Sequence, residues 1–499
     1  NMFNGEKLGI SKVLADSWNM QVIIFTLFLG AMVQIMSESG GTSAVVQKLS
    51  RVTSTRERGQ VLTWFMGLLI FFDDYANTML VGNAMRPVTD RLKISREKLA
   101  FLIDSTAAPI AGIAIVSTWV GVELGAIKDG LDSLNVAESF TNDVFIASIP
   151  YRFYPIFLIG FVMLIAATGR DYGPMLKAEQ DSLKGEGQKT DDAAGGAKES
   201  SIWYAIAPVL VLVGWIAVGF VMGHDDPDFD SVPLLLQASF FAAMTAAVLA
   251  ICGRALSLNK AAEAWMNGMT EMFPALVVLV LAWGVSSICK VEGLNTAGYI
   301  VEQLGDSISP KLMPTVAFIV SGAIAFAVGS SYATMGLLIP LFISLVGAML
   351  ASQGAESMEV AVMSNLMLST VGAILAGSIF GDHCSPISDT TVLSSAGAGC
   401  NHLRHVATQL PYALTVGVIA IVFGYLPAGF GMKPSLLLLM GFVACMIAVF
   451  AFGRRAEVDA EPQTKKQDTL PQVESGSQAR RGPAAQLMQH ISGSVLVVC

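Results

Sequence analysis

The sequence predicts an all-α polytopic membrane protein: an inverted repeat with two re-entrant hairpins and two discontinuous helices. The first observation is composition, because 53% of the 499 residues are apolar and only 14% are charged, whereas soluble domains carry about 25% charged residues. The second is that apolar residues gather in blocks about as long as the 20 residues that a spanning helix needs. The third is that two halves of the chain resemble each other. These features exclude a soluble protein and do not indicate a nucleic-acid partner.

The predicted spans follow from the apolar blocks. The full-length apolar segments are 19–36, 99–125, 149–169, 202–222, 232–252, 271–289, 361–395, 405–426 and 434–453. Two further apolar stretches carry polar residues at their centres. Residues 60–85 contain the pair Asp73 and Asp74, and residues 312–350, which are too long for one helix, contain GSSYATM.

Charge predicts how these two stretches enter the membrane. Basic residues lie on both sides of 60–85: Lys48, Arg51, Arg56 and Arg58 before it, and Arg86, Arg91, Lys93, Arg96 and Lys98 after it. A straight span would place the two groups on opposite faces, against the positive-inside bias. A re-entrant hairpin keeps both in the cytoplasm, and a second hairpin over 312–350 from the other face suits the remaining loops. Irregular backbone at membrane depth requires a protein-lined cavity, so the hairpins suggest a transport site.

Internal repetition supports this topology. The string DDYANTM from Asp73 resembles SSYATM from Ser330, and DSTAAPI from Asp104 resembles DHCSPI from Asp382. The halves enter from opposite sides, an arrangement common in secondary transporters. Because the second half has two additional apolar segments before its matching part, we expect about two helices to precede residue 1. The predicted divisions are a first repeat over 1–169, a cytoplasmic linker over 170–201, a second repeat over 202–426, an extra helix within 427–453 and a disordered cytoplasmic tail over 454–499.

Five aspartates fall inside apolar segments: Asp73, Asp74, Asp104, Asp382 and Asp389. Each would cost about 2.5–3.5 kcal/mol at the centre of a lipid-exposed helix, so they are predicted to be buried at a polar site. Pro109 and Pro386 are predicted to break the helices that carry them, which frees carbonyls for a cation. Hard oxygen donors suit Na⁺ or H⁺. Of the adjacent pair we favour Asp74 as the ligand, and capping of half-helix ends is the alternative for Asp104 and Asp382.

Other polar and aromatic residues are interpreted structurally. Glu38, Glu123 and Arg152 lie near predicted span ends, where long side chains reach the interface. The aromatic residues interpreted as packing or interface residues are Tyr75, Tyr332, Trp119 and Trp283. The possible zinc ligands are His383, Cys384, Cys400, His402 and His405. Their spacing is not that of a known zinc site, and the last two histidines are predicted to lie in a cytoplasmic loop, so zinc is disfavoured.

Long motifs resemble a known family. The strings FFDDYANTMLVG, MRPVTDRLKISREKLAFLIDSTAAP and GDHCSPISDTTVLSSAGAGCNHLRHVATQLPYAL are similar to hallmark segments of the NhaC-type Na⁺/H⁺ antiporter family. The resemblance implies a multi-pass carrier of the prokaryotic inner membrane, surrounded by lipid, in a homodimer, with Na⁺ as transported ion and no cofactor. It implies a cation and proton site at Asp73, Asp74, Asn77, Thr78, Asp104, Ser105, Thr106, Ser330, Ser331, Thr334, Asp382, Ser385, Asp389 and Thr390.

The predicted function is exchange of Na⁺ for H⁺ at buried aspartates by alternating access. The alternative is Na⁺- or H⁺-coupled carriage of a small organic anion such as lactate or malate, or of an amino acid, since family members also carry organic solutes. No lysine or arginine is predicted near mid-membrane, which disfavours an anion carrier. An intramembrane aspartyl protease would not require the inverted repeat, so an enzyme is not expected. A channel is disfavoured because the polar groups cluster at one depth.

Overall fold

The computed structural model describes residues 15–50, 54–185, 200–223, 231–273, 276–277, 280–281, 284 and 309–456. Almost all the secondary structure in these residues is helical, which confirms the predicted all-α class. Seven described helices are long and apolar enough to cross a membrane: Asn19–Glu38, Pro233–Cys252, Pro310–Val328, Ser331–Ser352, Asn365–Cys384, His402–Gly429 and Pro434–Phe452. A bent pair, Phe140–Tyr151 with Phe153–Thr168, would supply an eighth.

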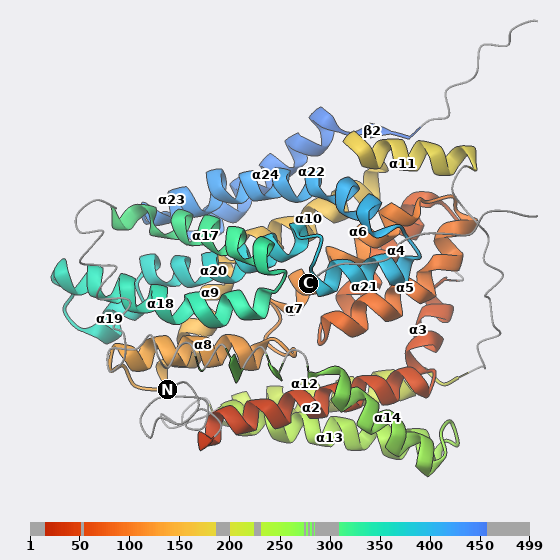
Figure 1. Cartoon of the computed structure of the whole chain (residues 1–499), viewed down its shortest axis with the longest axis horizontal. Coiled ribbons are helices and arrows are strands. Elements are labelled where there is room, and N and C mark those ends of the chain that lie inside the picture. The colour runs from red at the N-terminus through yellow and green to blue at the C-terminus, as the bar shows by residue number, and fades with distance from the viewer. Residues whose placement is uncertain are drawn as a thin grey trace, which may run out of the picture. The chain divides into compact units, whose positions relative to one another are not determined.

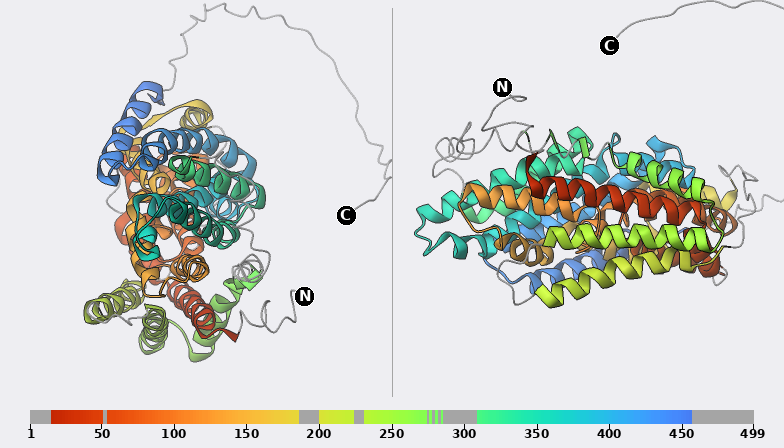
Figure 2. Two further views of the ribbon diagram at one scale, coloured as in Figure 1. Left: turned by 90° about the vertical axis from the view of Figure 1, so that its left-hand side faces the viewer. Right: turned by 90° about the horizontal axis from the view of Figure 1, so that it is seen from below.

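One group of long helices contains α2 (Ser17–Glu38), α12 (Trp203–Gly223), α13 (Ser231–Cys252) and α14 (Leu258–Glu271). Helix α2 packs against α13 and α14, and α12 packs against α13. Figures 1 and 2 show this group along one side of the other helices. Gly30 of α2 and Gly268 of α14 approach so closely that a side chain on either would overlap the other's carbonyl. We refer to these four helices as the α2 group.

The first predicted hairpin is present as α4 (Arg56–Leu69) and α5 (Asp74–Arg91). Helix α3 (Gly41–Ser50) precedes it. Thr55 caps the start of α4 by accepting the backbone N–H of Arg58 at 3.2 Å. The discontinuous helix that follows consists of α6 (Arg96–Asp104), a break, the short α7 (Ala108–Ala111), an irregular stretch over 112–119, and α8 (Val120–Ser133). Pro109 lies in the first turn of α7, where a missing N–H costs nothing.

The second hairpin consists of α17 (Met313–Val328) and α18 (Ser331–Ser352). Gly329 ends α17 with a φ of 69°, a conformation that glycine adopts without steric cost. The second discontinuous helix consists of α20 (Asn365–Cys384) and α21 (Asp389–Ala398), with Pro386 in the break. In Figure 1 the two hairpins come from opposite ends and both tips are directed to the middle. The predicted inverted repeat with two hairpins is therefore confirmed.

The remaining helices enclose this centre. Helix α9 (Phe140–Ser148) and the 3₁₀ turn η1 (Ile149–Tyr151) meet α10 (Phe153–Thr168) at a 43° bend. Helix α10 packs against α4, α20, α22 and α24. The other elements of the second half are η3 (Pro310–Leu312), α19 (Met358–Val362), α22 (His402–Ala420), the π-helical turn η4 (Ile421–Tyr425), α23 (Leu426–Gly429) and α24 (Pro434–Phe452).

Two predicted divisions carry more structure than we expected. The predicted linker over 170–201 begins with strand β1 (Arg170–Asp171) and helix α11 (Gly173–Lys184). Strand β1 pairs antiparallel with β2 (Arg454–Arg455), at the start of the predicted tail. The rest of the tail, Trp283 and most of the predicted span 271–289 lie outside the described residues.

Charged side chains fix α11 to the first repeat. Lys98 of α6 is buried and forms an ion pair with Asp171 of β1. The carboxylate of Glu179 on α11 accepts a hydrogen bond from the guanidinium of Arg56 on α4 at 2.5 Å and another from the backbone N–H of Ser95 at 2.7 Å. The backbone geometry of the linker is thus set by contacts with the first hairpin and α6, because unpaired buried charges would be costly.

Candidate functional site

Asp73 and Asp74 lie at the tip of the first hairpin, and both side chains are buried. Asn77, one turn further along α5, donates through Nδ2 to the carbonyl oxygens of Gly67 at 2.7 Å and Thr106 at 2.9 Å. It also lies 3.2 Å from the carbonyl of Ile70. Asn77 therefore ties the hairpin turn to the break after α6, and so positions the two aspartates.

The two repeats meet directly at this tip. The backbone N–H of Thr118 donates to the carbonyl of Phe72 at 2.9 Å. The Trp119 ring lies 5.0 Å from the ring of Tyr332, which belongs to the second hairpin. The packing role predicted for these two aromatic residues agrees with this contact. The irregular stretch 112–119 thus connects the hairpins to each other.

Asp104, at the end of α6, is buried among side chains of the second repeat. Its Oδ2 accepts Nε2 of Gln409 at 2.6 Å and the hydroxyl of Thr391 at 3.2 Å, and it lies 3.3 Å from Nε2 of His405. The prediction that His405 lies in a cytoplasmic loop is wrong, because α22 begins at His402 and carries His405 into the core. His402, in the first turn of α22, lies 2.6 Å from the carbonyl of Pro386.

His383 is a second histidine of this cluster. Its Nδ1 lies 2.9 Å from the hydroxyl of Tyr154, and its Nε2 lies 3.2 Å from the hydroxyl of Ser105. Gln409 also donates to the backbone carbonyl of His383 at 2.6 Å. The sequence pattern marks His383 and His405 only as possible zinc ligands, and it marks neither Gln409 nor Tyr154 as a site residue. The available signal was their polar character within apolar segments.

Asp382 lies at the other helix break. Its Oδ2 is 3.4 Å from the hydroxyl of Thr390, which lies 3.1 Å from the hydroxyl of Ser388. Asp382 interacts electrostatically with both Asp104 and Asp74. The structure therefore brings together carboxylates from both repeats, at the two breaks and one hairpin tip.

The other hydroxyl groups that are predicted ligands donate hydrogen bonds to backbone carbonyl oxygens. Thr78 donates to Tyr75, Thr106 to Leu102, Ser331 to Ser378, Thr334 to Ser330, and Ser385 to Phe326, at 2.7–3.2 Å. The Ser330 hydroxyl caps α18 by accepting the N–H of Ala333 at 3.3 Å. The lone pairs of these oxygens remain available to a cation, since a hydroxyl oxygen has two.

Asp389 does not lie where we expected. Its side chain, at the start of α21, is exposed rather than buried. Its Oδ2 accepts the hydroxyl of Tyr75 at 3.1 Å. The prediction of a buried carboxylate at this position is wrong, because the second break turns the first residue of α21 outward while Thr390 and Thr391 face the interior.

Several buried oxygens at the centre lack a hydrogen-bond donor. Within the described ranges, Asp74 Oδ1, Asn77 Oδ1 and Asp104 Oδ1 accept no hydrogen bond. Among the same residues, no lysine or arginine forms an ion pair with Asp74 or Asp382. In the part of the chain that the structure describes, no three His, Cys, Asp or Glu side chains are grouped to hold a metal ion. The chemistry of these oxygens suits a hard monovalent cation or a proton.

Arg152 and Glu123 also differ from our expectation. Arg152 lies at the bend between η1 and α10, is 0% exposed, and pairs with Glu123 at 2.6 Å. Its guanidinium also contacts the carbonyl of Gly112, at the end of α7, and lies 5.0 Å from the ring of Phe145. The prediction that these two charged residues reach the membrane interface is wrong. The charges of Arg152 and Glu123 compensate each other. The contact of Arg152 with the carbonyl of Gly112 fixes the end of α7.

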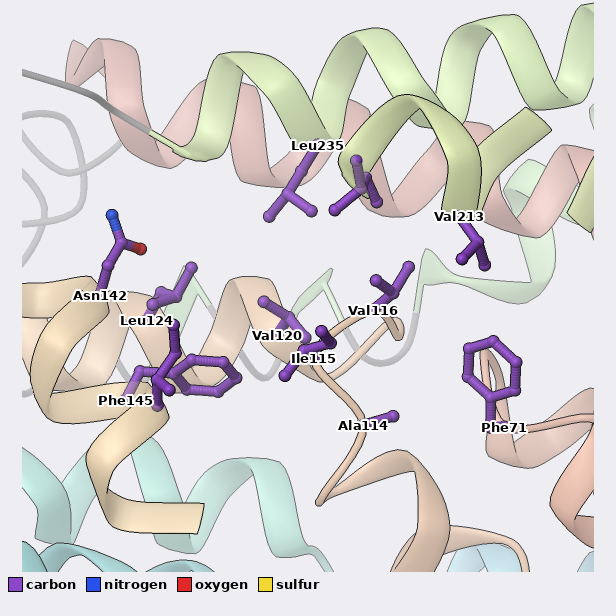
Figure 3. A pocket seen from close by; sticks show the side chains of 12 residues that line it. Phe71, Ala114, Ile115, Val116, Val120, Leu124, Asn142, Phe145, Val213 and Leu235 are labelled. Atoms are coloured by element: carbon purple, nitrogen blue, oxygen red, sulfur yellow. The ribbon is translucent and has the colours of Figure 1, made fainter. Parts of the chain in front are cut away.

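A larger pocket of about 360 Å³ lies away from the aspartates. Figure 3 shows it between Val213 and Leu235 of the α2 group on one side and the stretch 114–124 with Phe145 on the other. Asn142 is its one polar lining residue. The apolar lining does not suit an ion.

The helical bundle, its inverted repeat and its buried polar centre define a secondary membrane transporter. The sequence profile of the Na⁺/H⁺ antiporter family matches residues 110–430, and the chain belongs to this family. The family match points to a transporter.

Three proteins have sequences that align with part or most of this chain. A Haemophilus influenzae protein described as an uncharacterized protein is 31% identical over 470 residues, which are 89% of this chain and 86% of that protein. An uncharacterized Na⁺/H⁺ antiporter of the same species is 24% identical over 44% of this chain and 42% of its own length. The arginine/ornithine antiporter ArcD of Halobacterium salinarum is 27% identical over 45% of this chain and 41% of its own length.

A solved structure is similar in fold. The Alcanivorax borkumensis YdaH transporter superposes with a TM-score of 0.54 over 89% of each chain, at 17% sequence identity. Its crystal structure is described as having an unusual topology. At this identity the similarity concerns the fold alone.

Proposed function

We propose that this chain exchanges Na⁺ for H⁺ by alternating access, and that Asp74, Asp104 and Asp382 form the shared cation and proton site. The observation that carries the proposal is the approach of these three buried carboxylates from both repeats, without a lysine or arginine paired to Asp74 or Asp382 among the described residues. Membership of the Na⁺/H⁺ antiporter family supports it.

The physical argument concerns the cost of buried negative charge. Carboxylates that lie close together in a low-dielectric interior repel each other and lose hydration. Either a proton or a bound cation relieves both costs, so Na⁺ and H⁺ compete for the same oxygens. Exchange requires that competition and a change of the side from which the site is reached.

We extend the proposal to the chain's surroundings. The basic loops around the first hairpin favour a cytoplasmic location for that end of the bundle and for the C-terminal tail. An inner-membrane location, a homodimer and the absence of a cofactor other than the transported Na⁺ follow from the resemblance in the motifs and form part of the same proposal.

The test is a flux measurement on the full chain in proteoliposomes. We expect an imposed Na⁺ gradient to move protons in the opposite direction, read by an internal pH dye, with ²²Na⁺ uptake measured in parallel. Asp382→Asn should abolish both signals. Asp132→Asn is the matched control, because Asp132 lies on α8 in an i,i+4 pair with Lys128, away from the centre. The absence of Na⁺-driven proton movement by the wild-type chain would refute the proposal.

A second candidate is coupled carriage of an amino acid or a small organic anion. The printed name of the Halobacterium relative, an arginine/ornithine antiporter, favours a cationic amino acid within this alternative. The same vesicles, loaded with arginine, ornithine, lactate or malate in turn, separate the two functions by counterflow.

A further inference from the structure

The residues that directly follow Asp104 and Asp382, the two aspartates at the helix breaks, contact each other. Ser105 follows Asp104 at the end of α6, and His383 follows Asp382 at the end of α20. The hydroxyl of Ser105 lies 3.2 Å from Nε2 of His383. The two residues occupy matching positions in the strings DSTAAPI and DHCSPI. Matching positions of inverted repeats can meet only near the axis that relates the repeats, so this contact joins the two halves of the proposed cation site.

We propose that His383 is a positioning residue that sets the separation of Asp104 and Asp382, and thereby the preference of the site for Na⁺ over other alkali cations. This inference rests on the proposed function, because it assumes that Na⁺ binds at these aspartates. His383 does not bind the ion itself in this proposal, since hydroxyl groups occupy both of its ring nitrogens.

The imidazole ring of His383 is held from two sides. Its Nδ1 lies 2.9 Å from the hydroxyl of Tyr154 on α10, opposite the contact with Ser105. A neutral imidazole has one donor and one acceptor nitrogen, so one hydroxyl donates to the ring and the other accepts from it. The carboxylate of Asp104, 3.9 Å from Nε2, favours a proton on that nitrogen, and Tyr154 then donates to Nδ1. Hydrogen bonds thus run from α10 through α20 to α6.

Packing leaves this chain of hydrogen bonds little freedom. The exposed fractions of Tyr154 and His383 are 0% and 3%. The Tyr154 ring packs edge-on against Phe380, with centroids 5.1 Å apart, and the ring of Phe101 lies 6.5 Å from that of His383. A rotated imidazole would leave the buried hydroxyls of Tyr154 and Ser105 without this partner, which is costly. The end of α20 is therefore held at a fixed distance from the end of α6.

That distance bears on which alkali cation fits the site. Li⁺, Na⁺ and K⁺ carry the same charge and differ in size, so a site distinguishes them by the dimensions and stiffness of its oxygen ligands. Asp104 and Asp382 interact electrostatically, and two carboxylates repel each other. The contact between Ser105 and His383 opposes their separation. Without it, the ligands should move apart and accept a larger ion at less cost.

The test compares apparent affinities for Li⁺, Na⁺ and K⁺ in proteoliposomes that contain the full chain, with proton movement as the readout. Tyr154→Phe removes only the hydroxyl that anchors His383. We expect it to reduce the preference for Na⁺ over K⁺ by about 5-fold, the equivalent of one hydrogen bond. His383→Gln keeps an amide near Ser105 and loses the anchor, so it should have a similar effect. The double variant should add little to either, because both residues act through one chain of hydrogen bonds.

The matched control is Tyr425→Phe. Tyr425 is equally buried, but its hydroxyl accepts the backbone N–H of Phe153 at 3.1 Å. We expect this variant to keep the ion preference of the wild type. A role in stability alone would lower the amount of active protein and leave the ratio of ion affinities unchanged.

A folded Tyr154→Phe variant with the wild-type ion preference would overturn the inference and leave the proposed function standing. The same holds for a wild-type chain that exchanges Na⁺ and K⁺ equally well, and for an equal shift in Tyr425→Phe. No Na⁺-driven proton movement by the wild-type chain would overturn both. Circular dichroism and gel filtration verify that each variant is folded.

Discussion

Gln409 donates a hydrogen bond to Asp104 at 2.6 Å, although the two residues are 305 positions apart in the sequence. The same amide nitrogen donates to the carbonyl of His383 at 2.6 Å. One side chain of α22 thus connects the end of α6 in the first repeat with the end of α20 in the second. The relative position of the two helix breaks depends on this contact.

Removing the Gln409 amide should therefore destabilise the centre. Gln409→Leu leaves buried acceptors on Asp104 and His383 without their donor, and we expect a loss of about 1–3 kcal/mol in the free energy of unfolding. Thermal unfolding in detergent measures it. Gln60→Leu is the control, because Gln60 is also buried but its Oε1 has no partner among the described residues. Equal stability of the two variants would contradict the role of Gln409.

The two aspartates of the second break should differ in function. Asp382 is buried and interacts with Asp74 and Asp104, whereas Asp389 is exposed and accepts a hydrogen bond from Tyr75. We expect Asp382→Asn to abolish Na⁺-driven proton movement in vesicles and Asp389→Asn to retain it with an apparent Na⁺ affinity close to that of the wild type. An exposed carboxylate stays hydrated and has little to gain from an ion. Loss of exchange in Asp389→Asn alone would show that the exposed carboxylate is the essential one.

The Arg152 and Glu123 pair should behave as a buried pair. Arg152→Met leaves Glu123 as an uncompensated buried charge, and we expect a loss of about 3–5 kcal/mol in stability or a failure to accumulate in the membrane. Arg152→Met/Glu123→Leu should recover a large part of that loss. Lys128→Met, which breaks a more exposed pair on α8, should cost about 1 kcal/mol or less. Chemical unfolding measures all three variants. A double variant as unstable as the single one would mean that packing around Gly112, not charge, dominates.

A close approach of α5 and α21 should not tolerate a methyl group. A Cβ on Gly82 would lie 2.7 Å from the carbonyl carbon of Gly397. We expect Gly82→Ala to cost about 1–3 kcal/mol and to disturb the helix that carries Asp74. Gly214→Ala is the control, because nothing lies within 4 Å of its Cβ position. The readouts are unfolding and the Na⁺ dependence of exchange, and wild-type values for Gly82→Ala would show that the helices separate without cost.

The sequence predicted the architecture because its signals are local or repeated. Asp73 and Asp74 in mid-run between two basic loops indicated a hairpin, since charge and hydropathy act along the chain. The likeness of residues 73–79 to 330–335, and of 104–110 to 382–387, indicated the inverted repeat. The buried position of Asp74, Asp104 and Asp382 followed from the cost of charge in hydrocarbon alone.

The tertiary structure decided which side chains surround those aspartates. His405 and Gln409 reach Asp104 only because α22 begins at His402 and packs against α6 and α20, a choice that no local pattern encodes. Arg152 and Glu123 resembled span-end residues, and only the bend between η1 and α10 buries them together. Asp389 turned outward because the length of the break after α20 sets the rotation of α21. In each case the outcome depends on helix rotation and long-range packing, whereas hydropathy and repetition specify only which segments enter the membrane and from which side.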